Sequence, residues 1–292
     1  MVSNGRRYRH VLGFSIATLF SLASLHAEEN GVFLGGGFQY SNASAVNTMI
    51  SVDSSPISNT YTYNGNLFGA DIQAGYKQFF GKTKRFGLRY YGFFSGQGGS
   101  TSAINSTFEF AQTKPTSLID YGYAVINQPT ANLFYGVGVD FLYNFHESQQ
   151  RTFGLFLGAM LGGSSWLMGK ATMGNFCPWT NNDGICRSMN GYFAQWAKDL
   201  KDPSFYAYGN TKATFMPTFV QLILNFCLRA NFTKHQGFEA GVRVPTIDDP
   251  YFSATNVAGK KDHYALVGKG GSKETFTFRR NVAIFANYVF NF

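Results

Sequence analysis

The residue types that most often carry out catalysis are scattered through this sequence. It contains five histidines, and the three beyond the N-terminal segment are His146, His235 and His263. The first two fall in short predicted turns, and the third falls in a long loop at the opposite end of the predicted structure. A nucleophile, a general base and an orienting acid must lie within hydrogen-bond reach of one another. Because these histidines cannot meet in this way, we predict that the chain is not an enzyme.

No spacing of histidine, cysteine and acidic residues matches a metal site. The neighbouring acids Asp248 and Asp249 and the later Asp262 are expected to be solvated loop charges, with weak binding of a divalent cation as the alternative. The glycine runs at 35–37 and 98–99 are not phosphate-binding loops, because no helix start follows either run. We therefore expect neither a cofactor nor a metal.

Two of the three cysteines stand nine residues apart in a polar segment. Cys177 and Cys186 flank the sequence Pro-Trp-Thr-Asn-Asn-Asp-Gly-Ile, which is typical of a surface loop. In an oxidising compartment this spacing favours a disulfide. A zinc site is the alternative, but no histidine or second cysteine pair lies nearby. Cys227 lies in an alternating apolar run, where we expect a buried thiol.

The N-terminal segment has the three parts of a secretory signal peptide. Arginines precede an apolar core at 11–22, and small residues before Glu28 suit cleavage after Ala27. We expect residues 1–27 to be removed and residues 28–292 to form a single domain. Removal of three arginines lowers the formal charge from +8 to +5. That balance suits an anionic surface and does not require a nucleic acid partner.

The composition excludes an ordinary soluble enzyme and a helical membrane protein. Only 14% of the residues are charged, whereas 17% are aromatic and 33 are glycine; a globular domain carries about 25% charged residues. The sequence has no run of about 20 uncharged apolar residues, which a membrane-spanning helix needs. Few charges, many rings and many glycines are typical of strands that face lipid at every second residue.

Alternation of apolar and polar residues is the strongest structural signal. Along residues 133–145 every second side chain is apolar, and the intervening positions mix glycines, Asp140 and Asn144 with Phe134 and Leu142. The pattern recurs along 216–228 and along 276–292, where we place the apolar face of the last strand on the even-numbered residues, interrupted by Arg280. Five weaker segments, at 32–40, 68–76, 86–94, 153–161 and 238–244, bring the total to eight.

Short and long connections alternate between these eight segments. The long ones lie near 41–66, 97–130, 167–212 and 246–274. The alternation predicts an all-β fold, an eight-stranded antiparallel transmembrane β-barrel with short periplasmic turns and long extracellular loops. Side chains fill the interior of so small a barrel. The charged residues with inward parity are expected to pair there: Asp71, Lys77, Arg89, Asp140, Arg229, Glu239, Arg243 and Arg279.

The third long loop contains a helical pattern. Asn190 is a suitable N-cap for a short helix that ends at Leu200. One stripe of this helix would carry Tyr192, Phe193, Trp196, Ala197 and Leu200. One hypothesis makes Tyr192, Phe193, Trp196 and Leu200 a recognition surface for a host or lipid partner. The alternative packs the stripe over the barrel mouth as a lid. In the last loop Lys260, Lys261, Lys269 and Lys273 are expected to contact lipopolysaccharide or to remain solvated.

Two stretches carry a family resemblance. One joins the signal segment to the first strand and ends in Gly-Val-Phe-Leu-Gly-Gly-Gly-Phe-Gln-Tyr-Ser41; the other is the closing strand, Phe285-Ala-Asn-Tyr-Val-Phe-Asn-Phe292. Both resemble the Helicobacter outer membrane protein family, the Hop and Hor group. A small Hor-like member is the nearer match, because the chain lacks the long N-terminal extracellular domain of the large adhesins. The resemblance implies an outer-membrane location, with adhesin or porin activity among relatives.

The closing strand also carries an assembly signal in this interpretation. The resemblance implies that the barrel-assembly machinery recognises a terminal aromatic strand, here through Tyr288, Phe290 and Phe292. We expect a surface-exposed protein with a structural or adhesive role, whose loops contact a host-cell receptor or lipopolysaccharide, and no nucleic acid partner. The alternative is a small porin that forms a narrow diffusion channel.

Overall fold

The structure is a computed structural model, and it describes residues 29–52, 57–81, 83–105, 124–147, 151–181, 183–202, 211–256 and 271–292. The expected signal segment and its cleavage site, Ala27 and Glu28, lie outside the described residues. His263 and three lysines of the last loop, Lys260, Lys261 and Lys269, also lie outside them.

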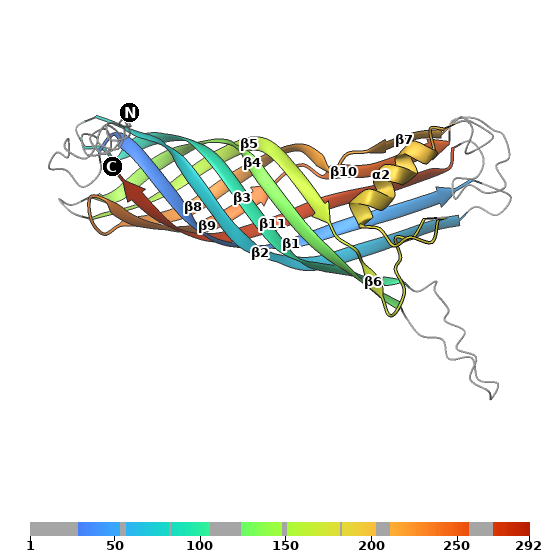
Figure 1. Ribbon diagram of the computed structural model, residues 1–292. Helices are drawn as coiled ribbons and strands as arrows, with labels where there is room; N and C mark the ends of the chain where they lie inside the picture. The colour runs from blue at the N-terminus through green and yellow to red at the C-terminus, as the bar shows by residue number, and fades with distance from the viewer. Residues whose placement is uncertain are drawn as a thin grey trace, which may run out of the picture.

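Eight antiparallel strands close into a ring, which confirms the predicted barrel (Figure 1). They are β1 (Gly31–Ser51), β2 (Ile57–Phe80), β3 (Phe86–Asn105), β4 (Ala124–Glu147), β5 (Thr152–Met168), β8 (Thr218–Asn231), β9 (Gln236–Pro245) and β11 (Lys273–Asn291). Pairing of β11 with β1, from Phe33 opposite Asn291 onward, completes the ring. The start of β1, the end of β11 and the short turns therefore lie at one end of the molecule.

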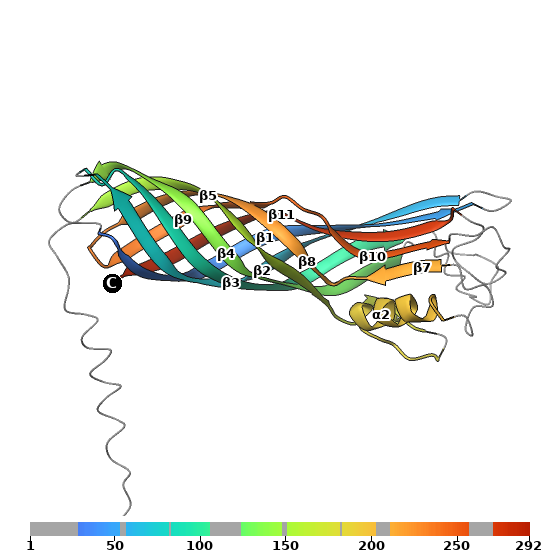
Figure 2. The ribbon, with the colours of Figure 1, turned by 90° about the horizontal axis from the view of Figure 1, so that it is seen from above.

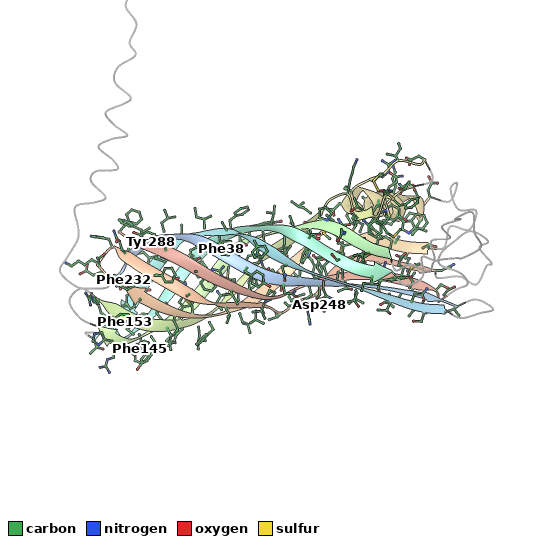
Figure 3. The ribbon with its side chains drawn as sticks, turned by 90° about the horizontal axis from the view of Figure 1, so that it is seen from below. Phe38, Phe145, Phe153, Phe232, Asp248 and Tyr288 are labelled. Carbon is green, nitrogen blue, oxygen red and sulfur yellow. A yellow bond between two sulfur atoms is a disulfide. The ribbon has the colours of Figure 1, made fainter. Side chains whose placement is uncertain are left out.

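Side chains alternate between the outside and the interior, as the sequence pattern predicts. On β4, Val137 and Phe141 are exposed, whereas Phe134, Asp140 and Leu142 are completely buried. The outward rings are visible along the wall in Figure 3, with Phe145, Phe153 and Phe232 near the end that carries the short turns. An apolar outer face about ten residues long on each strand is what a bilayer core requires. Among the described residues no helix is both long and apolar enough to cross a membrane.

A β-bulge on β11 reverses the predicted orientation of its first half. Between Arg280 and Ala283 two residues of β11 face the single residue Asn42 of β1, and such an extra residue switches the side-chain alternation. Phe276, Phe278 and Arg280 therefore point inward and are buried. The prediction that Arg279 faces the interior was wrong, because 54% of its side chain is exposed.

A belt of hydrogen-bonded polar side chains marks the level at which the wall leaves the lipid. Tyr40 donates from its hydroxyl to Asn66 Oδ1 at 2.9 Å, and Asn281 Nδ2 donates to Asn42 Oδ1 at 2.6 Å. Below these residues the outer face is largely apolar, and above them serine, threonine and asparagine alternate with scattered apolar residues such as Val46 and Ile104. We place the outer edge of the hydrocarbon layer at this belt.

The strands continue well past this belt, which corrects the predicted long loops. β1 has 21 residues and β2 has 24, and they pair from Gly31 opposite Lys77 up to Ser51 opposite Ile57. From Asn42 to Ser51, β1 adds roughly 30 Å of strand beyond the belt. Outside the lipid a paired strand needs no apolar outer face, so this part of the sequence gives only a weak signal. We call the part of the wall above the belt the extension.

The extension contains strands that the membrane-embedded ring lacks. Beside β11 it contains β10 (Asp249–Asn256) and then β7 (Thr211–Phe215), and on the other side β4 pairs with the short β6 (Thr172–Met173). Helix α2 (Met189–Asp199) lies along the wall between the end of β5 and β7 (Figure 2). The helix therefore covers the seam where strand pairing is interrupted.

Candidate functional site

Helix α2 is fixed at its first turn by two polar residues. Ser188 is the N-cap, and its hydroxyl accepts from Gly191 N at 3.1 Å. The prediction that Asn190 caps the helix was wrong by two residues. Asn190 lies in the first turn, where its Oδ1 accepts from Met168 N at 3.0 Å and from Tyr251 Oη at 2.8 Å. Because β5 and β10 supply these partners, one side chain ties the helix to both sides of the seam.

The apolar stripe of α2 packs into the barrel wall and does not form a lid over the mouth. The Phe193 ring lies 4.7 Å from that of Phe252 and 5.6 Å from that of Phe276, measured between ring centroids. Phe193 and Leu200 are buried, so neither can contact a partner, and this part of the recognition hypothesis is corrected. Tyr192 and Trp196 are half-buried at the surface.

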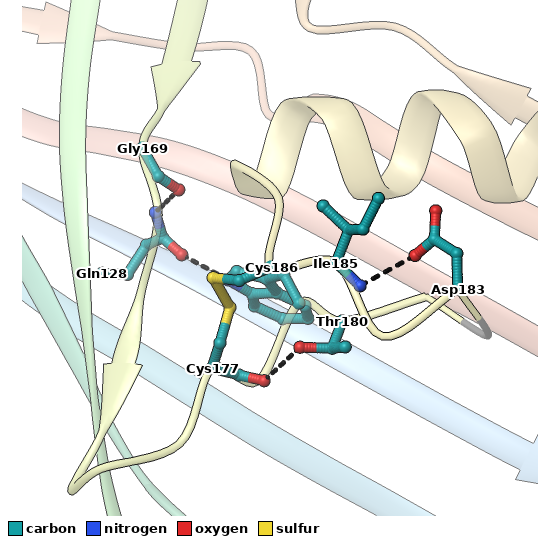
Figure 4. The surroundings of a disulfide bond; sticks show 8 residues. Gln128, Gly169, Cys177, Thr180, Asp183, Ile185 and Cys186 are labelled. Carbon is teal, nitrogen blue, oxygen red and sulfur yellow. Dashed lines mark hydrogen bonds between the residues drawn. A yellow bond between two sulfur atoms is a disulfide. The ribbon is translucent and has the colours of Figure 1, made fainter.

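The expected disulfide is present and holds a hairpin against the helix. Cys177 and Cys186 are bonded, and Figure 4 shows the bond beside the strand that carries Gln128. Between the two cysteines, Trp179 Nε1 donates to Gln128 Oε1 at 2.6 Å. The Trp179 ring also packs 5.4 Å from the ring of Phe193. The hairpin is therefore closed by the disulfide and held by Trp179 against both Gln128 and helix α2.

A groove of about 450 Å³ runs between this hairpin and α2. It is lined by Thr180, Asn181, Asp183, Arg187, Tyr192, Gln195, Trp196 and Asp199. Arg187 forms an ion pair with Asp183, and Gln195 Nε2 donates to Asp199 Oδ1 at 2.6 Å. Rings beside charged and amide groups suit a ligand that has both flat apolar faces and hydrogen-bonding groups. The sequence predicted the two rings but missed the hairpin side, whose position depends on the disulfide.

The barrel interior at the level of the lipid contains paired charges. Arg89 binds Asp140 at 2.6 Å and Glu239 at 2.7 Å, and Arg243 binds Asp71 at 2.6 Å. All five side chains are buried, which confirms the predicted internal pairing for these residues.

Aromatic rings pack against the same guanidinium groups. The Arg89 guanidinium lies 4.2 Å from the centroid of the Phe156 ring, and that of Arg243 lies 3.8 Å from the centroid of the Phe285 ring. Contacts at this distance contribute cation–π attraction as well as filling space. Ion pairs and rings therefore occupy this part of the interior.

The sequence from residue 71 to residue 292 matches the family model described as Helicobacter outer membrane protein. The chain belongs to this family. It is an integral outer-membrane β-barrel protein. No curated protein matches its sequence.

Several solved structures are similar to this chain. OprG from Pseudomonas aeruginosa is 12% identical with a TM-score of 0.43, over 92% of this chain and 99% of that chain. Neisserial surface protein A is 14% identical with a TM-score of 0.30, over 88% and 99%. The outer membrane protease OmpT from Escherichia coli is 7% identical with a TM-score of 0.36, over 93% and 99%.

The terminal strand presents rings to the lipid. Tyr288 and Phe292 are exposed, and the ring of Phe290 lies 5.0 Å from that of Phe292. His235 lies beside this strand, with its Nδ1 2.9 Å from the carbonyl oxygen of Asn291. Within the described ranges no group of three or more His, Cys, Asp or Glu side chains has the arrangement of a metal site.

Two acids are buried inside the extension. Burial raises the pKa of Asp249 to about 7, and neither of its carboxylate oxygens has a hydrogen-bond partner. Burial also raises the pKa of Glu274 to about 7, against the opposing effect of a hydrogen bond with Asn47. These acids differ from Asp248, which is partly exposed and pairs with Arg279 on the outer surface.

Proposed function

We propose that this outer-membrane protein has a structural or adhesive role at the cell surface, and that the groove beside α2 is its contact site. The observation that carries the proposal is the position of this groove on the extension, beyond the lipid belt. Its walls are held by a disulfide, by the Asn190 bridge and by the buried Phe193. A site held rigidly before binding loses little conformational entropy when a partner binds.

The packed interior supports a surface role over transport. The lipid-level interior holds the Arg89 and Arg243 ion pairs and the rings stacked on them. An open channel through this level would require several charged side chains to separate from their partners, which is costly in a buried site. We accordingly place a narrow porin second and an enzymatic role last. Steady current steps from purified protein in a planar bilayer would place the porin ahead of the surface role.

The partners follow from the surface chemistry. The groove suits a host-cell receptor that offers apolar faces and polar groups, and the exposed lysines Lys170, Lys198, Lys212 and Lys273 suit the phosphates of lipopolysaccharide. Tyr288, Phe290 and Phe292 would bind the barrel-assembly machinery before β11 pairs with β1.

The contact site is tested by replacing its two rings in intact bacteria. We expect Tyr192→Ala with Trp196→Ala to reduce attachment to cultured host epithelial cells at least tenfold, because both rings line the groove. The control is Thr62→Ala, an exposed position of β2 on the same extension. Heat-dependent gel mobility must first show that each variant forms a closed barrel. Unchanged attachment of a folded double variant would contradict the proposal.

A further inference from the structure

Arg280 is a buried cation without a buried anion. Only 3% of it is exposed, and its Nη1 donates to Gln97 Oε1 at 3.2 Å. Within the described part of the chain no carboxylate lies within ion-pair distance of this guanidinium. A buried charge without a counter-charge is strongly destabilising, so the site is electrostatically incomplete.

Two glutamine amides that accept from Arg280 and Arg243 are oriented with their donors unused. Gln97 Oε1 accepts from Arg280 and also from Ser41 Oγ at 2.9 Å, and Gln39 Oε1 accepts from Arg243 Nη1 at 3.1 Å. Because a guanidinium can only donate, these contacts fix which end of each amide faces the arginine. The Nε2 atoms of both glutamines, and Nε of Arg243, remain buried without a partner.

The acid that pairs with Arg243 is already fully engaged. Asp71 accepts from Arg243 at 2.6 Å through Oδ2 and from Asn287 at 2.8 Å through Oδ1. Arg243 and Arg280 repel each other across this part of the interior. We call Gln39, Ser41, Gln97, Arg243 and Arg280 the upper lumen tier; its unused hydrogen-bonding groups are donors, and it carries one uncompensated positive charge.

We propose that the upper lumen tier binds a small inorganic anion, such as chloride, as a fixed counter-ion of Arg280. The interior of an eight-stranded barrel is only wide enough for side chains, so a monatomic anion fits this chemistry better than a phosphate or a carboxylate. A water molecule could satisfy the glutamine amides but not the charge. This inference concerns the barrel interior and does not depend on the proposed contact site.

The test compares two adjacent arginines that face opposite ways. The full mature chain, refolded in detergent, is unfolded with urea in sodium chloride or in sodium gluconate at equal ionic strength, because gluconate is a much larger anion than chloride. We expect chloride to stabilise the wild-type protein in a saturable way, lowering the unfolding constant roughly tenfold when chloride is ten times its Kd. Arg280→Gln should lose this dependence, and Arg279→Gln should keep it, because Arg279 lies outside and pairs with Asp248.

A chloride response equal in Arg280→Gln and wild type would overturn the proposal, as would its absence from the wild type. If Arg280→Gln does not fold, crystals of the wild-type chain grown in sodium bromide decide the matter. We expect an anomalous scattering peak beside the Arg280 guanidinium and the Gln97 amide. A water bridging Gln97 to the unpartnered Oδ1 of Asn132, with no bromide peak, would refute it.

Discussion

Gly158 is the point at which one added methyl group should break the interior ion pairs. It lies opposite Asp140 in the β4–β5 register, and a Cβ atom at this position would lie 1.8 Å from Asp140 Oδ1. An ordinary contact is about 3.4 Å, so the carboxylate must move by about 1.6 Å. That displacement exceeds what the 2.8 and 2.6 Å bonds from Arg89 Nε and Nη2 can tolerate.

We expect Gly158→Ala to cost about 3 kcal/mol, the low end for breaking a buried ion pair and the high end for overpacking. Such a loss lowers the ratio of folded to unfolded protein more than a hundredfold. The assay is urea unfolding of the refolded barrel in detergent. Gly92→Ala is the matched control, because a Cβ atom there meets nothing within 4 Å. If the two variants unfold at the same urea concentration, the geometric reasoning fails.

Three further predictions concern the extension and the terminal strand. Replacing Cys177 and Cys186 by serine should cost the hairpin about 2.7 kcal/mol of loop entropy, and should speed its amide hydrogen exchange about a hundredfold without changing barrel mobility on gels. Because burial raises the pKa of Asp249 to about 7, the folded state holds this proton more tightly than the unfolded chain. The free energy of unfolding should fall as the pH rises from about 4 to about 7, and Asp249→Asn should flatten that decline in urea titrations. Phe292→Ala should lower the fraction of heat-modifiable barrel in the outer membrane severalfold relative to Phe38→Ala, which removes a lipid-facing ring far from the terminus; equal fractions would exclude a terminal assembly signal.

The sequence predicts the membrane half of the fold well because lipid imposes a strict rule on it. A residue such as Val137 must be apolar and its neighbour must suit the interior, so Asp140 and Arg89 could be assigned inward and expected to pair. Outside the lipid the outward-facing residues no longer need to be apolar. Ser44 and Thr62 belong to paired strands, but their types are equally common in loops, and the extension was therefore predicted as loop.

Two other differences between the sequence-based prediction and the structure have local causes. The bulge opposite Asn42 reverses the orientation of Phe276 and Arg280, and its one trace in the sequence is the charge of Arg280 on the otherwise apolar face. Ser188 and Asn190 are both good N-cap residues, and only the packing of β5 and β10 decides between them. The two rings of the proposed contact site were visible in the sequence, whereas the hairpin that completes the groove required the three-dimensional position of the disulfide.

The closure of the seam by a helix has a mechanical consequence. At the level of the lipid each strand is joined to the next by backbone hydrogen bonds around the whole barrel. In the extension the wall is closed instead by helix α2, through packed aromatic rings and the side chain of Asn190. A part of the wall that is closed by side-chain contacts should open more easily than a part that is closed by continuous backbone hydrogen bonds. We therefore expect unfolding of the barrel to begin in the extension, and loss of the α2 packing would leave the ring of eight strands in the bilayer closed.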